Sequence, residues 1–326
     1  MPPAGVPANV SVDVAALIGA ARDGNARAVA RLISMVEDAS PRLREVMAAL
    51  APVTGKAYVI GITGAPGVGK STSTSALVGA LRAAGRRVGV LAVDPSSPFS
   101  GGALLGDRVR MQDHALDRGV YIRSMASRGH LGGLAWSTPQ AIRVLDAAGC
   151  DVVLVETVGV GQSEVEIASA ADTTLVLLAP GMGDAIQAAK AGILEIGDVY
   201  VVNKADRDGA HQVVRELRNM LALAERVGGD WKPPIVSTVS VRGEGLDDLV
   251  KAIDAHRAWL ESDGRLADRR RKRAADEIAA IALTELRERF GDLAHDQRLE
   301  TLAARVVAGE TDPYAAADEL VAGVTD

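Results

Sequence analysis

The amino-acid sequence predicts an α/β fold, in which a mostly parallel β-sheet is flanked by helices and a helical extension stands at each end. Between residues 55 and 260, short apolar runs alternate with segments of helical periodicity. This alternation is typical of parallel strands that helices cover on both faces. Outside this range the pattern is helical. Six apolar runs are predicted to be strands: Tyr58–Ile62, Val88–Val93, Val152–Val155, Thr174–Leu178, Val199–Val202 and Ile235–Val239.

The same periodicity divides the chain into three regions. Residues 1–54 form a predicted N-terminal helical extension, and residues 55–260 form the α/β domain. Residues 261–326 form a predicted C-terminal helical arm. Its helices are predicted to begin at acidic residues, which are favoured at helix N-termini. These helices are Asp268–Phe290, Asp292–Ala308 and Asp312–Ala322.

The composition limits the functions open to the chain. Its 326 residues carry a formal net charge of −6, which disfavours nucleic-acid binding because phosphate backbones repel acidic surfaces. The single cysteine, Cys150, rules out a disulfide within the chain and a thiolate-rich zinc site. The sequence shows neither a signal-peptide pattern nor an apolar stretch of the roughly 20 residues that span a bilayer. We therefore expect a cytoplasmic protein with no membrane or nucleic-acid partner.

A phosphate-binding motif lies between the first predicted strand and a predicted helix. It is the Walker A pattern in the strand–loop–helix context that this pattern requires. Backbone N–H groups would surround the phosphates, and the helix N-terminus adds partial positive charge. Lys70 would reach the β- and γ-phosphates, and the Ser71 hydroxyl would coordinate Mg²⁺. The predicted nucleotide-binding residues of this motif are Gly64, Ala65, Pro66, Gly67, Val68, Gly69, Lys70, Ser71 and Thr72.

A second motif, Asn203-Lys204-Ala205-Asp206, follows the predicted strand Val199–Val202. The Asp206 carboxylate can accept hydrogen bonds from N1–H and the exocyclic amine of guanine. Adenine would leave this carboxylate unpaired, at a cost of roughly 1–3 kcal/mol, so the motif predicts GTP and GDP as ligands. Backbone donors to guanine O6 are predicted in the next turn, for which an ordinary strand-to-helix turn is the alternative. The residues of that turn are Ser240, Val241 and Arg242.

Three acidic residues are candidates for a magnesium site together with Ser71. Asp94 and Glu156 each end a predicted strand, and Asp107 lies in the Ser-, Pro- and Gly-rich loop after Asp94. Carboxylates gathered near phosphates would repel one another without a cation, and hard oxygen ligands suit Mg²⁺. Gly159 would sense the γ-phosphate through its N–H. The alternative for Asp94 and Asp107 is that they only cap turns.

With these motifs in place, the chain resembles the MeaB/ArgK family of methylmalonyl-CoA mutase-associated GTPases. The resemblance covers nearly the whole chain. It is carried by the segments Gly61–Ser71, Val93–Arg108 and Glu156–Glu164, of which the second is the most specific.

The resemblance implies a P-loop GTPase that hydrolyses GTP and acts as a homodimeric chaperone of an adenosylcobalamin-dependent acyl-CoA mutase. Such a chaperone gates cofactor delivery and protects the mutase from inactivation. The resemblance also implies that Lys70, Ser71, Asp94, Asp107 and Glu156 line the nucleotide–metal site and that the C-terminal arm forms the dimer contact. It further implies a third switch segment at residues 183–190, whose Asp184, Gln187 and Lys190 would relay partner binding to the nucleotide.

Hydrolysis needs a group that offsets charge in the transition state. We expect slow intrinsic turnover, with mutase binding repositioning the third switch so that Lys190 supplies this positive charge. Two other functions remain open at this point. One is a GTPase metallochaperone that inserts nickel, against which the single cysteine and scattered histidines argue. The other is a kinase of an amino-acid transport component, for which the sequence offers no obvious acceptor-binding domain.

Overall fold

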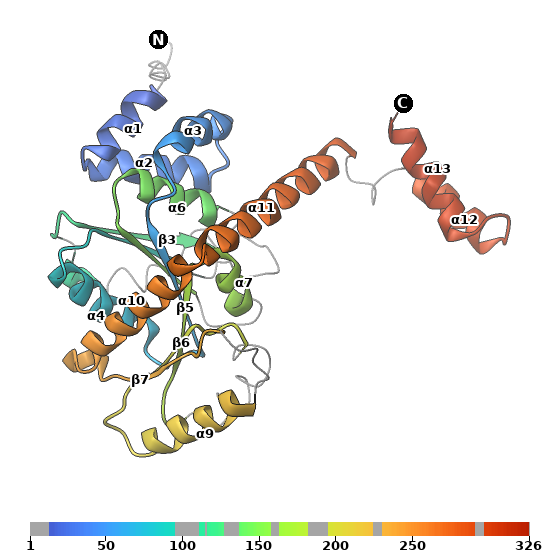
Figure 1. The fold of residues 1–326 in the computed structure, drawn as a ribbon. Helices are drawn as coiled ribbons and strands as arrows, with labels where there is room; N and C mark the ends of the chain where they lie inside the picture. Colours follow the sequence, from blue (N-terminus) through green and yellow to red (C-terminus); the bar gives the residue numbers. More distant parts are fainter. Residues whose placement is uncertain are drawn as a thin grey trace, which may run out of the picture. The chain divides into compact units, whose positions relative to one another are not determined.

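The computed structural model describes residues 13–94, 111–114, 116–126, 137–157, 163–181, 195–223, 230–290 and 297–325. Its centre is a seven-stranded sheet of order β3-β2-β4-β1-β5-β6-β7, in which every neighbouring pair is parallel (Figure 1). The predicted α/β class is therefore confirmed. The strands are β1 Tyr58–Thr63, β2 Val88–Asp94, β3 Val120–Ala126, β4 Val152–Glu156, β5 Thr173–Leu178, β6 Val199–Val202 and β7 Ile235–Ser237.

The structure corrects the expected set of strands at one edge of the sheet. β3 is absent from the predicted strands, because Arg123 and Ser124 interrupt its apolar run. Among the described strands, β3 lies at the edge of the sheet and pairs only with β2. Its arginine has a tertiary partner that the local pattern cannot supply, since the Arg123 guanidinium donates to the Glu37 carboxylate and to Ser34 Oγ at 3.0 Å. An edge strand with a charged side chain is a common arrangement, because such residues discourage further strand pairing.

Two layers of helices cover the two faces of the sheet, as Figure 1 shows. Successive side chains of a strand point to opposite faces, and β1 follows this rule. Val59 belongs to one buried cluster, with the N-terminal helices and α6, and Ile60 belongs to another, with α4 and α10. A third cluster joins α9 to β5 and β6. These helices are α1 Val14–Arg22, α2 Ala26–Glu37, α3 Leu43–Leu50, α4 Lys70–Ala83, α6 Thr138–Ala147, α7 Ser163–Ala170, α9 Ala210–Leu223 and α10 Leu246–Ser262.

A buried carboxylate connects α6 to the segment between the N-terminal helices and β1. Asp146 near the end of α6 accepts hydrogen bonds from the backbone N–H groups of Gly55, Lys56 and Ala57, directly before β1. These donors precede the strand ladder, so they need a partner from outside the sheet. The contact fixes where β1 begins, at the sheet edge opposite the ends that carry the predicted motifs.

The chain divides into two compact units, residues 1–266 and 267–326. The first unit contains the sheet and both helical layers. The second contains most of α11 (Arg265–Phe290), α12 (Gln297–Val307) and α13 (Pro313–Thr325). α12 and α13 pack through Leu302, Ala316 and Leu320, and Arg305 pairs with Glu319 at 2.9 Å. Over the part of the chain that the structure describes, no helix is both long and apolar enough to cross a membrane.

Candidate functional site

The predicted motifs meet at the carboxyl-terminal edge of the sheet. The glycine-rich loop follows β1, Glu156 ends β4, Asn203 follows β6 and Ser240 lies just beyond β7. Because all strand pairs are parallel, these strand ends lie at one edge. β1 is central there: the chain continues from β1 to β2 on one side and returns from β4 to β5 on the other. In open parallel sheets, ligands bind at this kind of reversal in strand order.

The shape of the phosphate loop depends on two of its glycines. Gly64 has φ 143° and Gly69 has φ 96°, a backbone region that L side chains rarely adopt. A Cβ on Gly64 would lie 2.3 Å from the Leu177 carbonyl oxygen, and one on Gly69 would lie 2.6 Å from Asn203 Nδ2. The loop is therefore pressed against β5 on one side and the Asn203 side chain on the other, and only glycine fits at both places.

Lys70 begins α4 with its ammonium group folded into the loop. Its Nζ donates to the carbonyl oxygens of Gly64 at 2.6 Å and Ala65 at 3.3 Å, and the residue is 8% exposed. The amide groups at the start of α4 add partial positive charge at the same place. The arrangement supplies a concentrated positive field that suits the oxygens of a nucleotide di- or triphosphate.

Glu156 and Ser71 bring hard oxygen atoms together beside this loop. The Ser71 hydroxyl donates to Glu156 Oε1 at 2.8 Å, and the carboxylate is buried. Among the described residues, no group of three or more His, Cys, Asp or Glu side chains converges on one point. Mg²⁺ at nucleotide sites is typically held by one or two carboxylates or hydroxyls, with phosphate oxygens and water completing its shell. The Ser71–Glu156 pair fits such an ion.

The other predicted metal-site and switch residues lie partly or wholly outside the described residues. Asp94 ends β2 two residues beyond Ala92, which pairs in register with Glu156, so its backbone lies at the same sheet edge. Its side chain is not among the described parts of the chain. Outside the described residues altogether lie Asp107, Gly159, Asp184, Gln187 and Lys190. Their roles stay predictions.

Asn203 connects the phosphate loop to the turn after β7. Its Nδ2 donates to the Val68 carbonyl at 2.9 Å, while its Oδ1 accepts from the Ser240 N–H at 3.2 Å and hydroxyl at 2.9 Å. Lys204 Nζ adds a bond to the Gly67 carbonyl at 2.7 Å. Side chains of the second motif therefore hold the backbone of the first. The turn predicted to contain backbone donors is a 3₁₀ turn, Ser240–Arg242.

Asp206 stands at the exposed end of this arrangement. Its Oδ2 lies 3.3 Å from Arg242 Nη1, and Arg242 also donates from Nε to Glu244 Oε1 at 2.7 Å. Glu244, followed by Asp206, raises the pKa of the guanidinium above its usual value. The main ion-pair partner of Arg242 is thus Glu244. The Asp206 carboxylate remains at the surface, where a base can approach it. The neighbouring Val241 is 78% exposed.

Two hydroxyl groups of α4 belong to the site although the sequence motifs do not include them. Ser73 Oγ lies 2.8 Å from Ser240 Oγ, and Thr74 Oγ1 lies 2.7 Å from Glu156 Oε2. The only signal in the sequence is the run of hydroxyl residues after Lys70, and it does not reveal the partners. Thr72, in contrast, is predicted from the motif and is half-buried.

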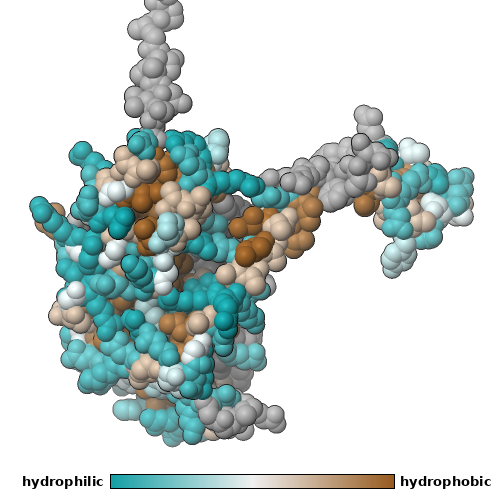
Figure 2. Space-filling model, turned by 45° about the horizontal axis from the view of Figure 1, so that its top comes forward, coloured by the Kyte–Doolittle hydropathy of each residue, from teal (hydrophilic) through white to brown (hydrophobic). Residues whose placement is uncertain are grey.

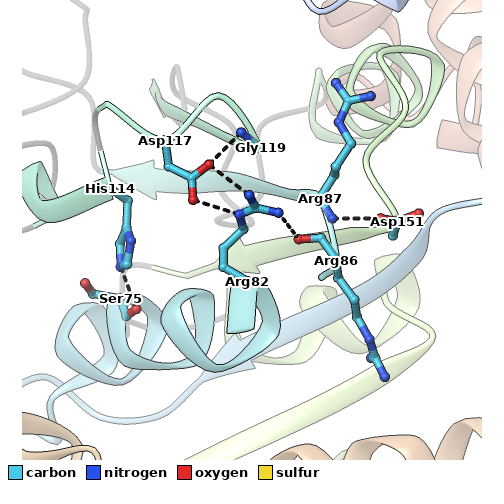
Figure 3. Close-up of polar contacts among 8 residues, drawn as sticks. All are labelled: Ser75, Arg82, Arg86, Arg87, His114, Asp117, Gly119 and Asp151. Carbon is cyan, nitrogen blue, oxygen red and sulfur yellow. Dashed lines mark hydrogen bonds and ion pairs between the residues drawn. The ribbon is translucent and has the colours of Figure 1, made fainter. Parts of the chain in front are cut away.

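Beyond the phosphate loop, α4 also holds the segment that leads into β3 (Figure 3). His114 Nε2 lies 2.9 Å from the Ser75 carbonyl oxygen, and Arg82 makes two bonds to the Asp117 carboxylate, at 2.8 and 2.9 Å. The Asp117 carboxylate also accepts from the Gly119 N–H at 2.7 Å. Arg82 and the Gly119 N–H hold the pKa of Asp117 below its usual value. The helix that starts at the phosphate loop is thereby anchored to the β3 edge of the sheet.

Comparison with known proteins agrees with this geometry. Residues 29–294 match the family described as "Methylmalonyl Co-A mutase-associated GTPase MeaB". A protein of Pyrococcus abyssi that is named as a GTPase is 48% identical over 307 residues, covering 94% of this chain and 95% of the relative. The "Methylmalonic aciduria type A homolog, mitochondrial" of Mus musculus is 32% identical over 321 residues, 91% of this chain and 76% of the relative. A solved structure described as an "LAO/AO transport system kinase" has a TM-score of 0.75 and 27% identity, covering 96% of this chain and 98% of that one.

Proposed function

This chain belongs to the MeaB family of P-loop GTPases, and we propose that it is a GTP-dependent chaperone of an adenosylcobalamin-dependent acyl-CoA mutase, with methylmalonyl-CoA mutase as the first candidate. In this role it gates cofactor loading and protects the mutase from inactivation. It acts in the cytoplasm, without a nucleic-acid or membrane partner. The family description, which names an association with that mutase, supports the proposal.

The observation that carries the nucleotide part of the proposal is the position of Asn203. One side chain joins the Val68 carbonyl of the phosphate loop to Ser240 of the turn beyond β7. This connection supports the proposal that Lys70 binds the phosphates and Asp206 recognises guanine on one connected frame. We propose that GTP and GDP bind across it, with the phosphates at Gly64–Thr72 and the base at Asp206 and Ser240–Arg242.

We propose that Mg²⁺ is held by Ser71, Glu156, Asp94 and Asp107. When bound, this ion offsets charge on the phosphate oxygens. The close approach of the Ser71 hydroxyl and the Glu156 carboxylate, 2.8 Å, supports the assignment of these two residues. In this scheme Lys70 binds the β- and γ-phosphate oxygens, and Gly159 contacts the γ-phosphate through its N–H.

Coupling to the mutase is assigned to the third switch, residues 183–190. We propose that mutase binding moves this segment and that Asp184 and Gln187 help relay the movement. The Lys190 ammonium then offsets transition-state charge, which speeds a slow intrinsic hydrolysis. The test is Lys190→Ala, measured as GTP hydrolysis with and without mutase. If mutase-stimulated hydrolysis were unchanged in this variant, the role of Lys190 would be wrong.

We also propose that the C-terminal arm, residues 261–326, forms a homodimer contact. Four large apolar side chains of α11 are exposed within less than three helical turns, and Figure 2 shows brown, apolar surface on this helix. They are Ile278, Ile281, Leu283 and Leu286. Exposed apolar clusters of this kind are typical of association surfaces. Light scattering of the full chain tests this: Ile278→Glu with Leu286→Glu should halve the measured mass.

The decisive experiment for the chaperone role is co-purification of this chain with the mutase. The chain is loaded first with GDP and then, in a separate sample, with a non-hydrolysable GTP analogue. GTP hydrolysis is then measured with and without the mutase. We expect binding in at least one nucleotide state and faster hydrolysis in the complex. Absence of binding in both states would contradict the proposal. A mutase whose adenosylcobalamin site is already filled is the matched comparison for cofactor gating.

The two alternative functions make different demands on the chain. The kinase alternative draws on the similar solved structure, which is described as a transport system kinase. A phosphotransfer assay with GTP or ATP and a candidate binding protein separates it from hydrolysis. The nickel alternative would need thiolate or imidazole ligands. Cys150 is the single cysteine of the sequence, and its burial raises the thiol pKa to about 12. A thiol with this pKa is a poor metal ligand at neutral pH.

A further inference from the structure

Thr74 lies one helical turn beyond Lys70 on α4 and makes a contact that the P-loop motif does not specify. The residue is fully buried. Its Oγ1 lies 2.7 Å from Glu156 Oε2 and 3.0 Å from the Lys70 carbonyl oxygen. The contact joins α4 to the end of β4 across 82 residues of sequence.

The single hydroxyl proton of Thr74 has two possible acceptors. The carboxylate is closer and charged, and a hydrogen bond to a charged acceptor is about twice as strong as a neutral one. The proton therefore goes to Glu156, and the approach to the Lys70 carbonyl is the ordinary proximity of residues four apart on a helix. Thr74 thus donates a hydrogen bond to Glu156 in addition to forming part of α4.

The two oxygens of Glu156 receive different hydroxyl groups of the same helix. Ser71 donates to Oε1 at 2.8 Å and Thr74 donates to Oε2 at 2.7 Å. Two donors on opposite oxygens fix the rotation of the carboxylate about its terminal bond. Glutamate has one more rotatable bond than aspartate, so it loses more freedom when it is held in one orientation. The hydrogen bond from the Thr74 hydroxyl offsets this loss of conformational entropy in the Glu156 side chain.

We infer that Thr74 is a positioning residue, which keeps Oε1 of Glu156 directed at Ser71 and thereby strengthens Mg²⁺ binding in the nucleotide complex. This inference rests on the proposed metal site. The Ser71 oxygen can offer a lone pair to a cation while its proton stays on Glu156, so the contact seen here is compatible with a bound ion. A partner outside the coordination shell that orients a ligand commonly changes metal affinity by about tenfold or more.

The test is the release of fluorescent N-methylanthraniloyl-GDP from the full chain, measured by stopped flow over a range of Mg²⁺ concentrations and in EDTA. Thr74→Val removes the hydroxyl and keeps the branched shape. We expect the Mg²⁺ concentration that gives half-maximal slowing of release to rise about tenfold. The release rate in EDTA should match that of the wild type. Thr74→Ser restores the donor and should bring the midpoint back.

Two comparisons separate positioning from packing. Thr173→Val removes another fully buried threonine hydroxyl, 2.8 Å from His256 Nδ1 at the amino end of β5, and should leave the Mg²⁺ midpoint unchanged. In a Glu156→Ala background, Thr74→Val should add no further shift, because its effect passes through Glu156. Thr74→Ala also removes the hydroxyl and puts no methyl group in its place. It should shift the Mg²⁺ midpoint of GDP release in the same direction as Thr74→Val.

The results of these measurements test the metal site and the role of Thr74 separately. If the wild type shows no Mg²⁺ dependence, the proposed metal site is wrong and the inference falls with it. If the wild type depends on Mg²⁺ but Thr74→Val and Thr74→Ala keep its midpoint, only the role of Thr74 is overturned. The same holds if these variants release GDP faster in EDTA to the same extent as with Mg²⁺, or if the shift persists in the Glu156→Ala background.

Discussion

The hydroxyl oxygens of Ser73 and Ser240 lie 2.8 Å apart, and they join the helix of the phosphate loop directly to the turn Ser240–Arg242, where we propose that the base binds. Both residues are buried. Ser240 also holds Asn203, which in turn holds the Val68 carbonyl. The bonds form a closed path from α4 through the turn Ser240–Arg242 and Asn203 back to the phosphate loop. The two halves of the proposed nucleotide site therefore share one hydrogen-bonded frame.

Removal of one hydrogen bond from this path should speed the release of bound nucleotide. Ser73→Ala deletes the direct bond, whose net worth is about 1 kcal/mol, so we expect GDP release to be about fivefold faster. Ser75→Ala on the same helix is the control, because the contact described for Ser75 is made by its backbone carbonyl. Stopped-flow release of labelled GDP measures both. Equal release rates for the two variants would show that the Ser73–Ser240 bond does not support nucleotide binding.

Asp206 should account for guanine selectivity. In the wild type, GDP should bind more tightly than IDP, which lacks the exocyclic amine, because a hydrogen bond to a charged group contributes about 1.5–3 kcal/mol. Asp206→Ala should weaken GDP binding and remove the difference between GDP and IDP. Calorimetric titration with both nucleotides measures this. Asp208→Ala, two residues on and exposed, is the control; a GDP preference that survived in Asp206→Ala would place base recognition elsewhere.

The Arg82–Asp117 pair should stabilise the fold in a pH-dependent way. The pKa of Asp117 is lowered, chiefly by Arg82, so its ionised form favours the folded state. This contribution is complete above the ordinary carboxyl pKa of about 4 and is lost as the pH falls through the lowered value. We expect Arg82→Gln to lower the urea midpoint at pH 7 and to differ less from the wild type near pH 3. Arg31→Gln, at an exposed position on α2, is the control. A difference that did not change with pH would contradict this account.

Asp146 should matter for stability and little for nucleotide binding. Asp146→Ala leaves the backbone N–H groups of Gly55, Lys56 and Ala57 without their acceptor. A hydrogen bond to a charged group contributes about 1.5–3 kcal/mol, and we expect urea unfolding to show its loss as a lower midpoint. Asp146→Asn keeps one acceptor oxygen and should lose less. GDP affinity should hold in both variants, since these contacts lie at the opposite edge of the sheet; if affinity fell in parallel with stability, the two edges would be coupled.

Local sequence was enough to predict the parts of the site that a motif determines. The phosphate loop, the Asn203–Asp206 motif and the Glu156 position each follow a buried strand, and strand direction alone brings them to one edge. The partners of Ser73 and Thr74 are 167 and 82 residues away in the sequence, and no local spacing encodes such contacts. β3 was not predicted for the same reason, because the partners of Arg123 are Glu37 and Ser34 on α2, which is distant in the sequence.

The central place of β1 has a consequence for synthesis of the chain. β1 is made early, yet its neighbours β4 and β5 are completed only at residues 156 and 178. The phosphate loop is complete at residue 71, but its support from Asn203 and Ser240 comes still later. A nascent chain on the ribosome therefore carries β1 without its native neighbours until residue 156, and a phosphate loop without its contacts to Asn203 and Ser240 until residue 240. The contacts that hold the phosphate loop from Asn203 and Ser240 therefore form only after β7 has been made, so the complete hydrogen-bonded frame is a property of the finished α/β domain.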